Sequence, residues 1–132
     1  MKVVTWREMA EFKGVDLEDS WILDWHYGAD VGGLVFDLEA SLWPDHSLYE
    51  KPVPDQYTCY KKARLIFQEA SVAGELPDPT PTIGTRDPDG SIDYGSINAL
   101  ELEDGLYHLV TDFADLYIRC VGLELNVAGG TV

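Results

Sequence analysis

The sequence predicts an all-β protein, an antiparallel β-sandwich or partly closed barrel of about seven strands in a single domain. Three observations lead to this fold class. Apolar residues alternate with other residues over 20–42, on both sides of a glycine-containing break, which is typical of a β-hairpin. Asp104-Gly105 favours a tight turn between two further strand-like segments. The chain contains no convincing long helical pattern.

The length and composition fit one folded unit. The chain has 132 residues, of which 45% are hydrophobic and 25% are charged, so it is long enough to bury a core. We therefore expect one β-rich domain over residues 1–132, with a frayed tail at 128–132.

The N-terminal segment is open to two interpretations. Residues 2–6 (KVVTW) could form a short strand, and residues 6–12 (WREMAEF) could instead form one or two helical turns. The acidic residues that follow, Asp16, Glu18 and Asp19, alternate with apolar neighbours and indicate an exposed strand or loop.

The predicted hairpin separates two kinds of side chain. In its first arm, aromatic and aliphatic residues at 21, 23, 25 and 27 alternate with the residues at 20, 22, 24 and 26. Because successive side chains of a strand point to opposite faces, we expect an apolar wall on one face and carboxylates with a histidine on the other.

The middle of the chain contains two long loops around one ambiguous segment. Residues 43–56 and 75–90 are rich in proline and are predicted to lack regular structure. Residues 57–68 fit either a strand or a helix, and their aromatic content and the neighbouring strands favour a strand.

The C-terminal third is predicted to consist of strands. Residues 91–102 and 106–112 flank the Asp104-Gly105 turn, and a last strand covers 116–127. Within that last strand the apolar alternation changes parity at Gly122. We therefore expect a β-bulge near Val121-Gly122, since one inserted residue would restore a common inward face.

The charge is strongly acidic. Asp and Glu number 24 against 9 Lys and Arg, which gives a net charge of −15. Such a surface repels nucleic-acid phosphates and anionic membranes, and it favours cationic partners or simply solubility. Without a secretory signal or an apolar run long enough to span a membrane, we expect a cytoplasmic protein. Cys59 and Cys120 are expected to be buried core residues, and whether they pair is left open.

The first candidate site is the polar face of the hairpin, with Asp24, His26, Asp37 and Glu39. A histidine beside carboxylates can act as a general base or a metal ligand, although alternation also produces such a solvated polar face without any function. Trp43 and His46 open the first long loop, where an exposed tryptophan could fill a partner's pocket or fold back onto the core.

Two further segments have plain structural explanations. Residues 87–93 only partly match a calcium-binding loop, and Pro-Asp-Gly is also a good turn. Lys61, Lys62 and Arg64 could grip an anion, but pairing with nearby carboxylates is the simpler expectation. We find no motif of a hydrolase, zinc site or nucleotide-binding loop, so we predict no catalytic residue and no cofactor.

These observations favour a small acidic binding module that docks on a basic protein, as inhibitors of nucleases and other toxins do. Its face would contain Asp24, His26, Asp37, Glu39 and Trp43, with the 43–56 loop. The alternative is a small-ligand protein or hydrolase with a site at the mouth of the β-fold. That site would be lined by Trp25, Tyr27, His26 or Tyr60. Oligomeric state is left open.

Overall fold

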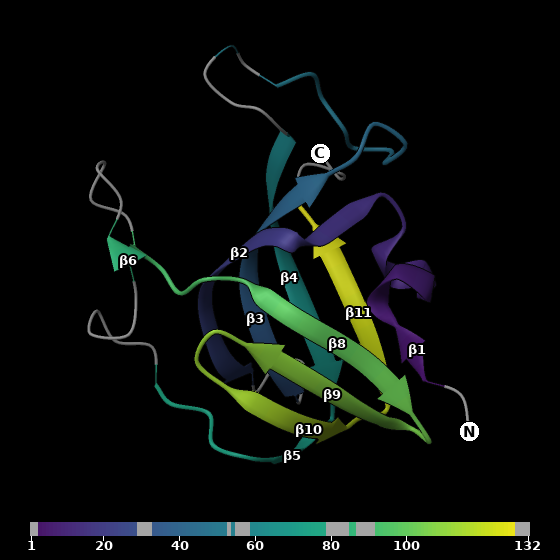
Figure 1. Cartoon of the computed structure of the whole chain (residues 1–132), viewed down its shortest axis with the longest axis vertical. Helices are drawn as coiled ribbons and strands as arrows, with labels where there is room; N and C mark the ends of the chain where they lie inside the picture. The colour runs from purple at the N-terminus through teal and green to yellow at the C-terminus, as the bar shows by residue number, and fades with distance from the viewer. Residues whose placement is uncertain are drawn as a thin grey trace.

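A computed structural model describes residues 3–28, 33–52, 54, 59–78, 85–86 and 92–128. These residues form two antiparallel β-sheets of five and four strands that pack against each other without closing into a barrel (Figure 1). The predicted antiparallel β-sandwich is confirmed.

The five-stranded sheet has the order β1-β8-β9-β10-β5. Its strands are β1 (Val4–Thr5), β8 (Ile97–Glu103), β9 (Leu106–Thr111), β10 (Asp115–Arg119) and β5 (Ser71–Ala73). The four-stranded sheet has the order β11-β4-β3-β2. Its strands are β11 (Gly122–Val127), β4 (Cys59–Gln68), β3 (Gly33–Leu42) and β2 (Val15–Gly28). A small ribbon of β6 (Thr85–Arg86) and β7 (Ile92–Asp93) lies beside them.

One hydrophobic core fills the space between the two sheets. Phe36 and Phe67 from the four-stranded sheet meet edge to face, and Phe67 also contacts Tyr107 of the five-stranded sheet. Leu109 and Leu116 are fully buried on the five-stranded side. These residues alternate with exposed ones, so each sheet presents its apolar face inward and a polar face outward.

The β2–β3 hairpin is confirmed, but its predicted faces are partly wrong. Ile22 and Trp25 both point into the core, whereas Trp21 and Tyr27 are 37% and 62% exposed. The pairing with β3 shifts register between Ile22 and Asp24. The extra residue there, Leu23, changes the parity of the strand, so the expected aromatic wall is divided between the two faces.

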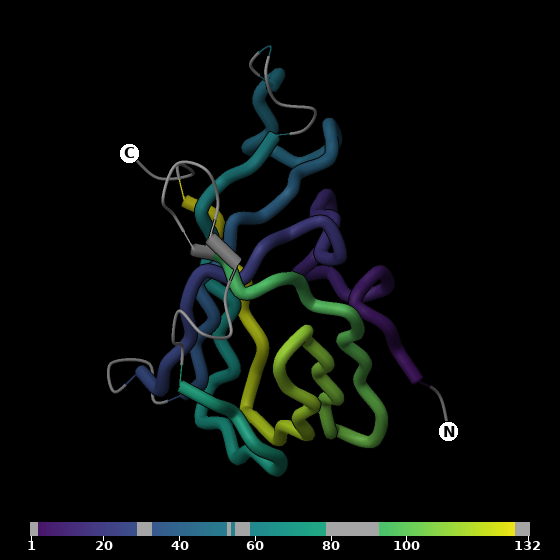
Figure 2. The backbone as a smooth tube through the Cα atoms, turned by 60° about the vertical axis from the view of Figure 1, so that its left-hand side comes forward, coloured from purple at the N-terminus to yellow at the C-terminus, as the bar shows by residue number. Residues whose placement is uncertain are grey.

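The structure decides between the interpretations that the sequence left open for two segments, one on either side of this hairpin. Both interpretations of the N-terminal segment hold in part, because β1 is followed by 3₁₀ turns at Trp6–Glu8 and Ala10–Phe12. The ambiguous segment is a strand, β4. The described part of the 43–56 loop contains turns without a helix or strand, and it projects beyond the ends of the sheets (Figures 1 and 2).

The region from 75 to 103 differs from its prediction. The expected loop at 75–90 includes β6, and the expected strand at 91–102 is divided into β7 and β8. The division falls at Tyr94–Ser96, where the backbone turns to pair with β2: Tyr94 N–H donates to the Ile22 carbonyl, and Ile22 N–H donates to the Gly95 carbonyl, each at 2.8 Å.

The prediction of a single last strand with a bulge is wrong. Residues 115–127 form two strands in different sheets, with β10 pairing with β9 and β11 pairing with β4. Ile118 and Leu123 are buried from opposite sides of the core. The change of parity at Gly122 therefore marks the passage of the chain from one sheet to the other.

Both cysteines are free, with Cys59 buried and Cys120 half-buried. Burial raises the pKa of the Cys120 thiol, which favours its neutral form. At the predicted tail, Ala128 N–H donates to the Lys62 carbonyl at 2.7 Å, and residues 129–132 lie outside the described part. No helix among the described residues has the length and apolar character needed to cross a membrane.

Candidate functional site

The structure brings three of the predicted site residues together on the outer face of the four-stranded sheet. Asp24 of β2 lies directly opposite Asp37 of β3, and His26 follows on the same strand as Asp24. One potential ligand atom from each of the three side chains lies within 4.8 Å of the others. The sequence placed these groups on a shared face, and the strand register makes them neighbours.

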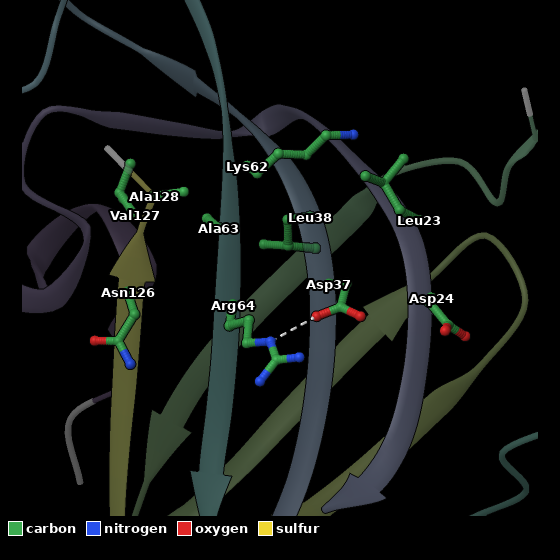
Figure 3. Close-up of a pocket in the computed structure, with 10 residues that line it drawn as sticks. All are labelled: Leu23, Asp24, Asp37, Leu38, Lys62, Ala63, Arg64, Asn126, Val127 and Ala128. Carbon is green, nitrogen blue, oxygen red and sulfur yellow. Dashed lines mark hydrogen bonds and ion pairs between the residues drawn. The ribbon is translucent and has the colours of Figure 1, made fainter. Parts of the chain in front are cut away.

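The two carboxylates are held differently. Asp24 Oδ1 accepts a hydrogen bond from the backbone N–H of Trp25 at 2.8 Å. Asp37 Oδ1 accepts one from Arg64 Nε of β4 at 3.1 Å (Figure 3). Asp37 therefore has a cationic neighbour, whereas Asp24 and His26 stand at the exposed side of the cluster.

Glu39 lies further along the same outer face. It is opposite Trp21 of β2 and forms an ion pair of 3.7 Å with Lys62 of β4. Lys61 contacts Glu50 of the loop that precedes β4, and this hydrogen bond raises the pKa of Lys61. The expectation that the basic residues of this strand pair with neighbouring carboxylates is confirmed.

An open groove of about 550 Å³ crosses this outer face. Its polar wall follows one row of the sheet, from Asp24 through Asp37 and Arg64 to Asn126, one residue from each of the four strands (Figure 3). Leu23, Leu38, Lys62, Ala63, Val127 and Ala128 complete the lining. The groove thus offers both signs of charge, an amide and apolar contacts on an open sheet surface.

Asp24, His26 and Asp37 are also the residues that could hold a divalent cation. Carboxylate oxygens and an imidazole nitrogen are suitable donors for such ions. Arg64 would compete for Asp37, since it already donates to that carboxylate. The arrangement is therefore compatible with a cation and equally with the polar surface that strand alternation produces.

Trp43 and His46 lie apart from this cluster. Six residues of extended chain separate Asp37 from Trp43, roughly 20 Å at about 3.3 Å per residue. Trp43 stacks on Trp6 with ring centroids 6.5 Å apart, and His46 Nδ1 accepts from Leu48 N–H at 3.0 Å. Trp43 is 41% exposed, so it covers Trp6 and still presents part of its ring to solvent.

The exposed aromatic residues of β2 were missed by the sequence reasoning. Trp21 and Tyr27 were assigned inward by strict alternation, and no sequence signal marks the register shift that turns Trp21 outward. Trp25, by contrast, is a core residue. Its indole N–H donates to the Pro77 carbonyl at 2.6 Å, and its ring stacks on Phe113 at 4.2 Å.

Comparison of the chain with protein-family models, curated proteins and solved structures finds no match. Its function must therefore be argued from the site itself.

Proposed function

We propose that this protein is a binding module that docks on a basic protein through the outer side of the β2–β3 hairpin. The observation that carries this proposal is the composition of β2, the edge strand of the four-stranded sheet. Over its 14 residues it has four carboxylates and no Lys or Arg, and it exposes Trp21 and Tyr27.

Carboxylates and exposed aromatics contribute differently to docking. Long-range attraction from the carboxylates accelerates encounter with a cationic surface. Tryptophan and tyrosine supply most of the contact energy at many interfaces, because each buries a large apolar area at a small entropic cost. Trp21 and Asp24 lie opposite Glu39 and Asp37 on the outer face, so these two contributions come from one surface. Tyr27 lies opposite the buried Leu34 and is exposed at the end of the strand.

The backbone of β2 favours recognition by side chains over addition of another strand. Its central residue Ile22 already exchanges two hydrogen bonds with the Tyr94–Gly95 segment, and Trp21 is bridged to Ser96. A partner strand could not pair along this part of the edge without displacing that segment.

The proposal is tested by affinity capture with matched variants. The wild-type chain and Trp21→Ala/Tyr27→Ala are immobilised, and retained proteins are identified and then purified for calorimetry at low and high salt. We expect a dominant partner with a basic isoelectric point, at least about tenfold weaker binding by the variant, and weakening with salt. Val121→Ala, which trims an exposed apolar side chain outside the hairpin, is the control.

Capture of only neutral or acidic proteins, or binding that salt and the β2 variant leave unchanged, would refute the docking proposal. A cytoplasmic location belongs to the same proposal and is consistent with the two free thiols. Imaging of a tagged full-length chain in its native cell tests that location.

The groove supports a second candidate function, binding of a small ligand. Its volume of about 550 Å³ is in the range of known ligand sites, and Arg64, Lys62 and Asn126 provide polar contacts. A fragment screen by ligand-observed NMR distinguishes the candidates. Hits that compete for one site and are lost in Arg64→Ala would favour a ligand protein.

A further inference from the structure

The outer face of the five-stranded sheet carries a second polar surface that the proposed function does not use. Glu101 of β8 lies opposite His108 of β9, and His108 lies opposite Tyr117 of β10. The residues that alternate with them, including Leu100, Leu109 and Leu116, are fully buried in the core. Glu101, His108 and Tyr117 therefore form one outward row across three neighbouring strands.

A hollow of about 170 Å³ opens beside this row. It is lined by Val3, Glu101, Glu103, Leu106, His108 and Tyr117. Two walls are apolar, one is aromatic, and the remaining polar groups are carboxylates. The lining contains no Lys or Arg, unlike the groove on the other sheet.

The aromatic wall is a flat double layer. The rings of His108 and Tyr117 stack with centroids 4.4 Å apart and an interplanar angle of 2°. Asp115 Oδ1 contacts His108 Nε2 at 2.6 Å, which fixes the orientation of the imidazole. Tyr117 remains 46% exposed, so part of this layer is open to a ligand.

The carboxylates of the hollow are not paired with a cation in the described part of the chain. Arg119, two residues from Tyr117 on β10, lies on the same face and reaches toward the turn at Gly105. Within the described part of the chain, Glu101 and Glu103 take part in no hydrogen bond or ion pair, whereas Asp37 and Glu39 on the other sheet each contact a cation. Glu101 and Glu103 are two residues apart on β8 and point to the same side, which separates their Cα atoms by roughly 6.6 Å.

We propose that this hollow receives the guanidinium group of an arginine side chain from a partner protein. A guanidinium presents several N–H donors in a rigid plane, so it can bond both carboxylates at once, and its flat face stacks on aromatic rings. Its methylene stem would lie against Val3 and Leu106. A lysine ammonium is a point charge with no planar face, so the site discriminates against lysine.

This inference goes beyond the proposed docking function and does not depend on it. The hollow lies on the outer face of the five-stranded sheet, whereas Asp24, Trp21 and Tyr27 belong to β2 of the four-stranded sheet. An arginine could be recognised here whether or not the β2–β3 face binds a protein, so the two proposals fail separately.

The experiment is a titration of the full chain, followed by ¹H–¹⁵N NMR, with N-acetyl-arginine amide. N-acetyl-lysine amide and N-acetyl-citrulline amide serve as the charged and the neutral comparison. We expect saturable shifts at Val3, Glu101, Leu106, His108 and Tyr117. The apparent Kd for arginine should be about two- to fivefold lower than for lysine, because a cation stacked on an aromatic ring gains about 0.5–1 kcal/mol at exposed sites. Citrulline should cause no saturable shift.

Two variants locate the effect. Glu101→Gln/Glu103→Gln should weaken arginine binding at least tenfold, since both charge-assisted hydrogen bonds are lost. Tyr117→Phe should retain binding and Tyr117→Ala should weaken it, because the ring face and not the hydroxyl is used. Glu75→Gln/Asp78→Asn makes the same change in net charge at two exposed residues outside both proposed surfaces and should leave the Kd unchanged.

Three outcomes would overturn the proposal. Equal affinities for arginine and lysine would mean general attraction to an acidic protein. Equal weakening by the Glu75→Gln/Asp78→Asn control would also mean general attraction to an acidic protein. Shifts confined to residues outside the hollow would place arginine elsewhere. Because none of the substituted carboxylates is buried, the fold should persist in each variant, and the NMR spectrum itself verifies it.

Discussion

On the outer face of the four-stranded sheet, Arg64 and Lys62 of β4 each lie against a carboxylate, Asp37 and Glu39 respectively. On the outer face of the five-stranded sheet, Glu101 and Glu103 have no such cation in the described part of the chain. Both faces are built by strand alternation from similar residue types. The difference lies in whether the neighbouring strand supplies a counter-charge.

This difference shows that net charge alone does not locate an acidic binding surface. The face that the sequence favoured contains Asp24, Asp37 and Glu39, yet Asp37 and Glu39 are each paired with a cation within the sheet. The smaller hollow beside Tyr117 has two carboxylates, and neither forms an ion pair in the described part of the chain.

The largest expected difference between the sheets is in the unfolding free energy lost when one glycine of a hairpin in each sheet is replaced. A side chain at Gly33 would overlap the carbonyl oxygen of Phe67, which is part of the β4 backbone. Gly105 has a positive φ of 76°, but there an added Cβ would meet no atom closer than 3.9 Å. We expect Gly33→Ala to cost at least about 3 kcal/mol and Gly105→Ala about 1 kcal/mol, measured by urea unfolding. Similar losses of unfolding free energy for the two variants would contradict this expected difference between the sheets.

A smaller loss of unfolding free energy is expected when a buried hydroxyl group is removed from either sheet. Ser20 Oγ donates to the Asp16 carbonyl and accepts from Ser41 N–H, which connects β2 to β3 where their register shifts. Ser20→Ala leaves that buried N–H without a partner and should cost about 1–3 kcal/mol of unfolding free energy.

Thr111 has the corresponding role in the five-stranded sheet. Its Oγ1 accepts from Phe113 N–H at 3.2 Å and Ala114 N–H at 3.0 Å, which shapes the turn between β9 and β10. Thr111→Val should also cost about 1–3 kcal/mol, and Thr111→Ser should restore most of it. Thermal and urea unfolding measure the stability of the Ser20 and the Thr111 variants. A neutral Thr111→Val would show that this turn does not need its hydroxyl.

The next smaller effect is a pH dependence of folding stability that arises from two groups on the five-stranded side. Burial raises the pKa of Cys120 and of Tyr107, so the unfolded chain loses these protons at a lower pH than the folded chain. Their contribution to stability is complete below the ordinary pKa of each group and declines as the pH rises above it. We expect the Tm to fall at alkaline pH and the fall to be shallower in Cys120→Ala. Identical slopes would exclude a contribution from this thiol.

The smallest expected effect is that of the surface charges on stability. Lys62→Gln/Arg64→Gln removes two exposed ion pairs and should cost less than about 1 kcal/mol. Glu101→Gln/Glu103→Gln removes two carboxylates without partners in the described part and should leave stability unchanged or slightly higher. Chemical unfolding at low salt measures both. If Glu101→Gln/Glu103→Gln lowered the unfolding free energy as much as Lys62→Gln/Arg64→Gln, the comparison of the two charged faces would be contradicted.

Alternation and turn chemistry predicted much of the architecture. The β2–β3 hairpin and β4 are present, and Asp104 and Gly105 both have the positive φ values, 53° and 76°, of a tight hairpin turn. The approach of Asp24, His26 and Asp37 also follows from the hairpin register, although their role in binding stays a prediction.

The errors have a common physical cause. An alternation pattern reports which residues share a face but not which sheet faces them, so the change of parity at Gly122 was taken for a bulge within one strand. The register shift near Leu23 is not visible in the sequence either, because it depends on the pairing with β3. The hollow beside Tyr117 joins β8, β9 and β10 with Val3, a juxtaposition set by sheet order.

The sheet order also bears on how the protein is made. Val4 of β1 pairs with Leu102 of β8, and β11 pairs with β4. Each sheet thus joins early and late parts of the polypeptide, and β4 has no neighbour on one side until Val127 has been synthesised. While the ribosome is still extending the chain, the apolar edge around Leu65 and Phe67 remains open to chance encounters with other nascent chains. Because the chain carries a net charge of −15, mutual repulsion would oppose the association of unfinished copies.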